Sequence, residues 1–133
     1  MKYILMMQGK IADWKAQNST TWPPGAFQAH IDFLISLNKT LTENGELAAV
    51  VALTSPEESR IVRAGPGGQP AITDGPFPEA KEFLAGYWIV DVDSHERALQ
   101  IAAVASTAPG PDGAPMNMPI EVRPVMGAPG EEM

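Results

Sequence analysis

The apolar positions along the chain follow two different periods, which together predict four strands and two helices. The strand segments are apolar at successive positions, as in 46–53, so both faces of each strand would have to be covered. Phe27, Ile31 and Leu34 instead recur at the spacing of one helical face. The predicted order is strand 2–8, helix 25–44, strand 46–53, strand 83–92, helix 94–106 and strand 118–126.

Turn residues mark the ends of these elements. Gly45 stands where the first helix would end in a left-handed cap, and Asp93 with Glu96 resembles an N-terminal capping box for the second. Residues 9–24 are mostly polar or turn-like and predict no regular element. Between 54 and 82, short segments flank a Gly-Pro-Gly-Gly run, which indicates a hairpin with a flexible tip.

The order of elements predicts the fold. Two β-α-β units around an inserted hairpin give an α+β, ferredoxin-like β-α-β-β-α-β sandwich with both helices on one face of the sheet. Pro124 lacks a backbone N–H and so places the last strand at an edge. We expect one domain over residues 1–126 and a flexible tail over 127–133.

The sheet face opposite the helices would be left bare and apolar. Such a face is usually an interface. We therefore predict a homodimer in which two sheets pack face to face and close a dimeric α+β barrel. The face would include Tyr3 or Ile4, Val50 or Val51, and Tyr87 or Trp88.

Composition narrows the classes of partner. The 133 residues include 9 Lys plus Arg and 16 Asp plus Glu, and the net charge of −7 argues against nucleic acid. No run approaches the roughly 18 apolar residues of a membrane helix, and the apolar N-terminal run is too short for a signal peptide. Cysteine is absent, which excludes disulfides and thiolate chemistry. We expect a cytoplasmic protein without membrane attachment.

The run Thr73-Asp74-Gly75-Pro76-Phe77 begins the longest of several matching segments. Together with 2–6, 45–47, 84–92 and 120–125, it makes the chain resemble the YCII-related family, in its DGPF branch. The resemblance implies a dimeric α+β barrel and a suspected His–Asp site in its cavity, with no established general reaction. Related barrels isomerise, eliminate from or oxygenate small, often aromatic molecules, and DGPF proteins are often encoded beside extracytoplasmic-function sigma factors.

One departure from the family concerns two loops. The stretches 65–68 and 109–119 are long and rich in proline and glycine. They predict a cavity mouth that differs from that of smaller relatives.

Asp74 and His30 are the candidate catalytic residues. The turn places Asp74 beside Pro76 and Phe77, where a carboxylate partly shielded from water could act as a general base. Asp74 could equally hold the turn by accepting backbone N–H bonds. The resemblance implies a histidine on the first helix, and His30 is the only one there. It borders the apolar helical face, so we expect it to face the cavity, although a lone helix histidine is more often a packed or surface residue.

Four further residues are candidates for substrate binding. Phe77 and Trp88 could line an aromatic cavity, although an aromatic residue in a central strand more often belongs to the core or an interface. Lys81 could reach an anionic ligand near Asp74, or pair with a neighbouring glutamate. Arg123 shares with Glu121 either the face opposite the helices or the rim of the sheet, where an exposed ion pair contributes little.

Two interpretations of function stay open. No phosphate-binding Gly loop, nucleophile elbow or metal-spaced histidine pair occurs, so neither a cofactor nor a metal is expected. The chain could be a cofactor-independent enzyme, in which His30 and Asp74 relay a proton on a small aromatic or lactone-like molecule. Alternatively, it could be a non-catalytic module that binds a metabolite or supports a sigma-factor-linked response.

Overall fold

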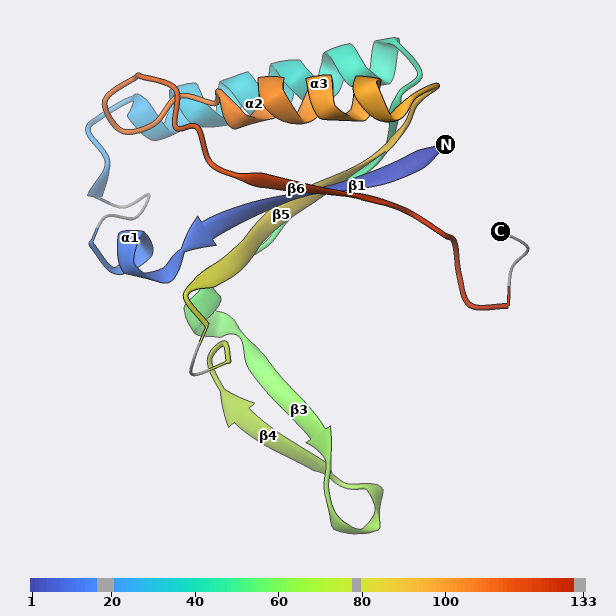
Figure 1. Ribbon diagram of the computed structural model, residues 1–133. Coiled ribbons are helices and arrows are strands. Elements are labelled where there is room, and N and C mark those ends of the chain that lie inside the picture. The colour runs from blue at the N-terminus through green and yellow to red at the C-terminus, as the bar shows by residue number, and fades with distance from the viewer. Residues whose placement is uncertain (17–20, 78–79, 131–133) are drawn as a thin grey trace.

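The computed structural model of the chain describes residues 1–16, 21–77 and 80–130 (Figure 1). Of the predicted C-terminal tail, residues 131–133 lie outside this range. Pro78 and Glu79, which continue the DGPF run, also lie outside it.

Four antiparallel strands form the sheet, and two long helices cover one face of it. The strands are β1 (Lys2–Lys10), β2 (Leu47–Ala52), β5 (Glu82–Asp91) and β6 (Ile120–Pro124), in the order β2-β5-β1-β6. Helices α2 (Ala26–Glu43) and α3 (His95–Ser106) lie together on the same side (Figure 1). The predicted ferredoxin-like α+β fold is confirmed, and β6 with Pro124 is an edge strand, as the missing N–H requires.

Local hydrogen bonds explain where the helices begin and end. Gly45 has φ +72°, and the N–H groups of Gly45 and Glu46 donate to the carbonyls of Thr42 and Leu41, which closes α2 with a Schellman motif. The expectation for the start of α3 is wrong by one residue. Ser94, not Asp93, is the N-cap, because its Oγ accepts from the Arg97 N–H at 3.1 Å.

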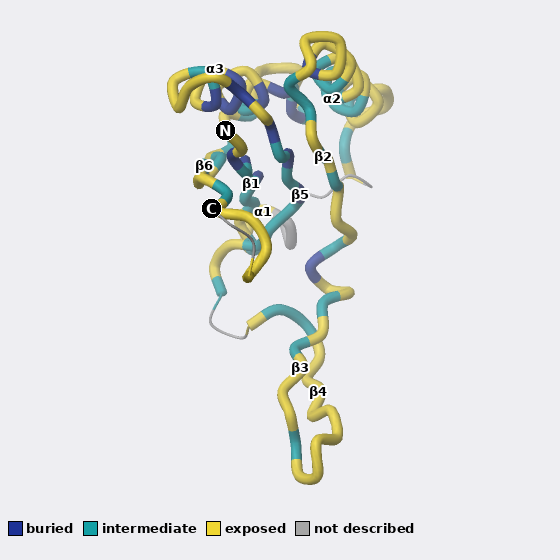
Figure 2. Tube along the Cα trace, turned by 90° about the vertical axis from the view of Figure 1, so that its right-hand side faces the viewer, coloured by how far each residue is buried: buried dark blue, intermediate teal, exposed yellow. Residues whose placement is uncertain are grey.

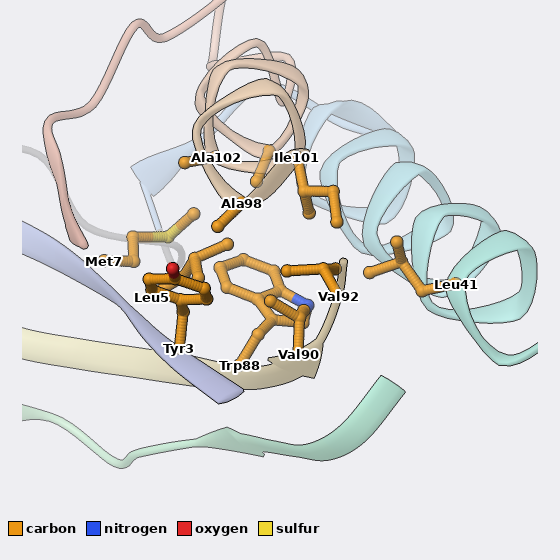
Figure 3. Close-up of a cluster of buried hydrophobic side chains, with 11 residues drawn as sticks. Tyr3, Leu5, Met7, Leu41, Trp88, Val90, Val92, Ala98, Ile101 and Ala102 are labelled. Atoms are coloured by element: carbon orange, nitrogen blue, oxygen red, sulfur yellow. The ribbon is translucent and has the colours of Figure 1, made fainter. Parts of the chain in front are cut away.

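The core lies between the sheet and the two helices (Figure 3). Tyr3, Leu5 and Met7 alternate along β1 toward the helices, and Trp88 and Val90 do the same from β5. The remaining members of this buried cluster are Leu41 of α2, Val92, and Ala98, Ile101, Ala102 and Ala105 of α3.

None of the described helices covers the opposite side of the sheet, which is here called the outer face (Figure 2). The strand register resolves the sequence alternatives, because Ile4 lies opposite Ile89 and Val51 lies opposite Tyr87, whereas Val50 lies opposite the buried Trp88. The apolar side chains of this outer face are half-buried in the single chain, whereas its two charged side chains on the edge strand are exposed. Its members are Ile4, Met6, Ala49, Val51, Tyr87 and Ile89, with Glu121 and Arg123 on the edge strand.

A separate two-stranded hairpin projects from the sheet layer on the side away from the helices (Figures 1 and 2). It consists of β3 (Arg60–Ala64) and β4 (Pro70–Asp74), and it confirms the predicted hairpin. A short 3-10 turn, η2 (Pro56–Glu58), connects it to β2. A second turn, η3 (Pro66–Gly68), forms its tip. Residues 59–75 are called the arm below.

A short helix appears where the sequence predicts no regular element. Helix α1 (Ile11–Ala16) follows β1 directly, and the Ile11 N–H donates to the Lys81 carbonyl at 2.8 Å. Six residues are too few to show an apolar face or to be stable alone, so their helicity depends on this tertiary anchor. None of the described helices is long and apolar enough to cross a membrane.

One ion pair fastens α3 to the start of β2. Arg97 donates from Nε and Nη2 to the two carboxylate oxygens of Glu46, at 2.8 and 2.9 Å. The Glu46 side chain is only 15% exposed. The hydrogen bonds from Arg97 hold the pKa of Glu46 below its ordinary value of 4.5. A carboxylate with a lowered folded pKa stabilises the fold above its unfolded pKa, and this stabilisation is lost as the pH falls through the folded value.

We expect Glu46→Gln to lower the free energy of unfolding by about 1–2 kcal/mol at pH 7, since it removes a charge-assisted, two-pronged hydrogen bond. The deficit should shrink as the pH falls below 4.5, where the native carboxyl also becomes protonated. Urea denaturation at pH 7 and pH 3 measures both effects. Glu43→Gln is the control, because its exposed pair with Lys39 is 4.0 Å long and should contribute almost nothing. A deficit that does not change with pH would contradict the assignment.

Candidate functional site

A cavity of about 510 Å³, here called the inner pocket, lies between the first turns of α2 and the ends of β1 and β5. The segment after β2 and the segment before β6 complete its walls. Most of the lining is apolar or aromatic, as is usual for a small-molecule site. Its polar residues are Gln8, Lys10, Asp13, His30, Thr54, Ser55 and Asn117.

His30 lines this pocket from the second turn of α2 and is half-buried. Its Nδ1 lies 3.0 Å from the carbonyl oxygen of Pro109. A carbonyl can only accept, so this contact assigns the proton of the neutral ring to Nδ1 and leaves a lone pair on Nε2. Nε2 forms no hydrogen bond with any residue in the described part of the chain. The ring is therefore fixed in orientation with one nitrogen able to accept a proton.

Two aromatic rings hold the imidazole in place. Trp22 contacts the His30 ring edge-on at a centroid distance of 5.5 Å, and Phe27 stacks on it at 6.2 Å. Trp22 and Phe27 also contact each other edge-on at 5.6 Å. All three rings line the inner pocket, so a flat apolar ligand would meet aromatic surface next to the imidazole.

The segment 116–119 forms a fixed wall of the pocket. The Ser106 hydroxyl donates to the Met118 carbonyl at 2.7 Å, and the Met116 N–H donates to the Ala108 carbonyl at 2.9 Å. Asn117 has φ +54°, a left-handed conformation that asparagine tolerates better than most residues. Of the two long loops expected to shape the mouth, residues 116–119 line the pocket. Residues 65–68 lie at the tip of the arm and line neither cavity.

Asp74 lies at the root of the arm and not in the inner pocket. Its carboxylate is 90% exposed and pairs with Arg60 Nε at 3.2 Å. The next residue, Gly75, has φ +77° and donates its N–H to the Ser59 carbonyl at 2.7 Å, so the turn closes the base of the hairpin. Within one chain, no hydrogen bond or ion pair joins Asp74 to His30. The carboxylate that shares a pocket with His30 is Asp13 of α1.

Phe77 lines a second cavity of about 430 Å³ at the root of the arm, and its side chain is 62% exposed. Residues 53–56 and Phe83 line both cavities, so these residues separate the two. The second cavity also contains Arg60 and Ile61 of β3. The DGPF motif is thus divided, with Asp74 in the arm's ion pair and Phe77 on a cavity wall.

The other three candidates for substrate binding lie outside both cavities. Trp88 is 4% exposed in the core, and its Nε1 donates to the Asn38 side-chain oxygen at 2.7 Å. Lys81 is exposed and forms no ion pair with a described residue, while its possible partner Glu79 lies outside the described residues. Arg123 is exposed on the outer face, opposite Ile4.

Several pocket residues could not be identified from the sequence. Lys10, Asp13, Phe83 and Asn117 reach the site only because the sheet brings three distant segments together. Trp22 offered the one local signal, as an apolar residue in a polar stretch. Across the part of the chain that the structure describes, no three His, Cys, Asp or Glu residues lie close enough to hold a metal ion.

Comparison with known proteins matches residues 1–110 to the family model of the YCII-related domain. An uncharacterised protein of Rhizobium meliloti (strain 1021) is 32% identical over 99 residues, which cover 74% of this chain and 75% of that protein. The match to the family model spans every element from β1 to α3 and includes His30 and the DGPF run.

Proposed function

Because the chain belongs to the YCII-related family, we propose that its inner pocket binds a small, largely apolar molecule and that His30 exchanges a proton with it. The reaction is an isomerisation or elimination that needs no cofactor. The observation that carries the proposal is the hydrogen bond from His30 Nδ1 to the Pro109 carbonyl. It fixes the tautomer in which Nε2 is the base, in a pocket whose lining is mostly apolar or aromatic.

The pocket favours a planar substrate with an acidic C–H or O–H group. Trp22, Phe27 and Phe83 supply flat apolar surface, and the three methionines of the lining can adapt to different shapes. Lys10, on the wall of the same pocket, would favour a carboxylate or phenolate on the ligand. An aromatic acid or an unsaturated lactone has these properties.

The second proton carrier is assigned to Asp13, since it is the carboxylate that lines the pocket with His30. A catalytic dyad of His30 with Asp74 stays a prediction, because the two residues of one chain do not lie in the same pocket. Asp74 would have to act from a neighbouring subunit, because its own carboxylate pairs with Arg60 at the root of the arm.

The test begins with a ligand screen by thermal shift, using aromatic acids and lactones. A ligand at about 100 times its Kd should raise the stability by roughly 2.7 kcal/mol. Turnover of the ligands found is then compared in His30→Asn and His30→Gln. The asparagine amide can still donate to the Pro109 carbonyl but offers no base at the Nε2 position, whereas glutamine reaches the Nε2 position and abandons the Pro109 bond.

We expect both variants to lose turnover by roughly 100-fold or more, the usual contribution of a general base. His30→Asn should keep its melting temperature and bind the ligand almost as tightly as the wild type. Full turnover in His30→Asn would exclude His30 as the base. Ligands that bind the wild type but are never converted would favour the second interpretation.

That second interpretation is a non-catalytic, cytoplasmic ligand-binding module, including one linked to an extracytoplasmic-function sigma factor. It is supported by the separation of Asp74 from the pocket, since a family site that uses both residues is incomplete in one chain. The Asp74-Gly75-Pro76-Phe77 run supports the assignment to the DGPF branch.

We further propose that two chains pair through their outer faces as a homodimer. Its support is the apolar character of the central strands on that face, where Ile4 and Met6 lie beside Tyr87 and Ile89 and no helix of the described ranges covers them. Met6 lies at the centre, between Tyr87 on β5 and Glu121 on β6. A charge introduced at Met6 would therefore oppose this pairing.

A further inference from the structure

The arm exposes an apolar surface that its own chain leaves uncovered. Val62 and Ile72 lie directly opposite each other in the hairpin, so they share one face. Their side chains are 60% and 62% exposed. All five residues of β4 are exposed, and in β3 only Ile61 is half-buried. A lone two-stranded hairpin is marginally stable at best, and a sheet normally buries one face against a second layer.

The direction of the arm indicates where that second layer is. Both views show the hairpin leaving the sheet on the side away from α2 and α3, which is the side of the outer face (Figures 1 and 2). A body placed against the outer face would therefore lie beside the arm. The Gly75–Ser59 hydrogen bond and the Arg60–Asp74 ion pair join the two strands at the root of the arm. The arm is therefore an ordered hairpin that extends from the fold.

Charge favours a second copy of this chain as that body. The arm contains two arginines and one aspartate, a net charge of +1, whereas the chain as a whole has a net charge of −7. Arg63 is exposed and forms no ion pair with any residue in the described ranges. A basic arm is attracted to an acidic body, and an identical subunit supplies one.

We propose that the arm clasps a second copy of the chain, with the Val62–Ile72 face packed on the partner subunit. The proposal rests on the outer-face homodimer. A two-fold axis makes the contact reciprocal, so the dimer contains two clasps and both arms gain the layer that they lack. The arm would then be a determinant of dimer affinity separate from the sheet.

Sedimentation velocity over a range of protein concentrations tests this with three variants. The arm variant is Val62→Ser/Ile72→Ser. Its matched control is Ile35→Ser/Val104→Ser, which removes two apolar side chains that are 59% and 48% exposed on the helix layer. The third variant, Met6→Glu, tests the outer face itself. Circular dichroism confirms that each variant is folded.

We expect a wild-type dimer at micromolar concentration. Two clasps are lost together in the arm variant, so its dimer Kd should rise roughly 10- to 100-fold. The control should keep the wild-type Kd, and Met6→Glu should be monomeric. Hydrogen exchange gives a second measurement: the arm's amides should be protected in the wild-type dimer and exchange quickly in the Met6→Glu monomer.

The outcomes separate the two proposals. A wild type that stays monomeric would overturn the outer-face dimer and the clasp together. A second outcome is a dimer that Met6→Glu dissociates but whose Kd the arm variant does not change. It would overturn the clasp alone and indicate that the arm's apolar face binds a different protein. Arm amides that exchange equally fast in dimer and monomer would also overturn the clasp.

Discussion

Trp88→Ala is expected to lower the free energy of unfolding by about 3–5 kcal/mol, the range for removing a large aromatic residue from a core. The indole lies between the sheet and the helices, in the centre of the buried cluster (Figure 3). It fills this space and also donates from Nε1 to Asn38 Oδ1 at 2.7 Å, which ties β5 to α2. The alanine variant loses both the packing and the hydrogen bond.

A smaller change separates these two contributions. Trp88→Phe keeps most of the apolar volume but removes the donor, and we expect it to cost about 1–2 kcal/mol. Asn38→Ala leaves the indole N–H without its partner and should cost a similar amount. The double variant Trp88→Phe/Asn38→Ala should lose less free energy of unfolding than the sum of the two single losses. Urea denaturation gives the free energy of unfolding of the wild type and of each variant. All are measured at one fixed protein concentration, because dimerisation would make the midpoint depend on concentration. If Trp88→Ala were as stable as the wild type but bound the ligand less tightly, Trp88 would be a substrate-binding residue and not a core residue.

The strand register explains why the sequence could not decide the role of Trp88. Strands that are apolar on both faces lack the alternation that assigns each side chain to a side. Tyr87 and Trp88 were therefore equivalent candidates for the outer face. Pairing fixes the choice, since Trp88 lies opposite Leu5, which is completely buried, while Tyr87 lies opposite Met6 on the outer face.

The fold itself was accessible because its signals are local. Gly45 at the end of α2 and the helical spacing before it mark one element without knowledge of the rest. Pro124 identifies an edge strand by the N–H that it lacks. Helix α1 was missed because its first N–H bonds to Lys81, a residue distant in sequence.

The site depends on contacts that no local pattern contains. His30 could be singled out by its place on the margin of the apolar helical face, but the tautomer depends on Pro109, which is 79 positions away. Asp74 is prominent in the sequence because it begins the DGPF motif, yet its nearest charge is Arg60 at the other side of the arm's root. Asp13 carries no motif and reaches the pocket only through the path of the chain after β1.

Gly86→Ala is expected to destabilise the fold by about 2–3 kcal/mol. A Cβ at this position would lie 2.6 Å from the backbone oxygen of Val51 and 3.3 Å from the Ala52 Cα. Both contacts belong to the backbone of β2, which is hydrogen-bonded to β5 and cannot yield without breaking the ladder. Overpacking of this kind typically costs 1–3 kcal/mol, roughly, and exceeds the entropic gain of about 0.4–1 kcal/mol from replacing glycine.

Gly9→Ala is the matched control, because its Cβ would meet a side chain rather than a backbone. The contacts are the far end of the Phe83 ring, at 2.7 and 2.8 Å. A small swing of the Phe83 side chain about its Cα–Cβ bond moves the ring tip away and relieves them, so we expect a loss below about 1 kcal/mol. Phe83 lines both cavities, and its displacement should instead weaken ligand binding in the thermal-shift assay. Chemical denaturation of the two variants side by side gives the order, and a larger loss in Gly9→Ala than in Gly86→Ala would contradict the rigid pairing of β2 with β5.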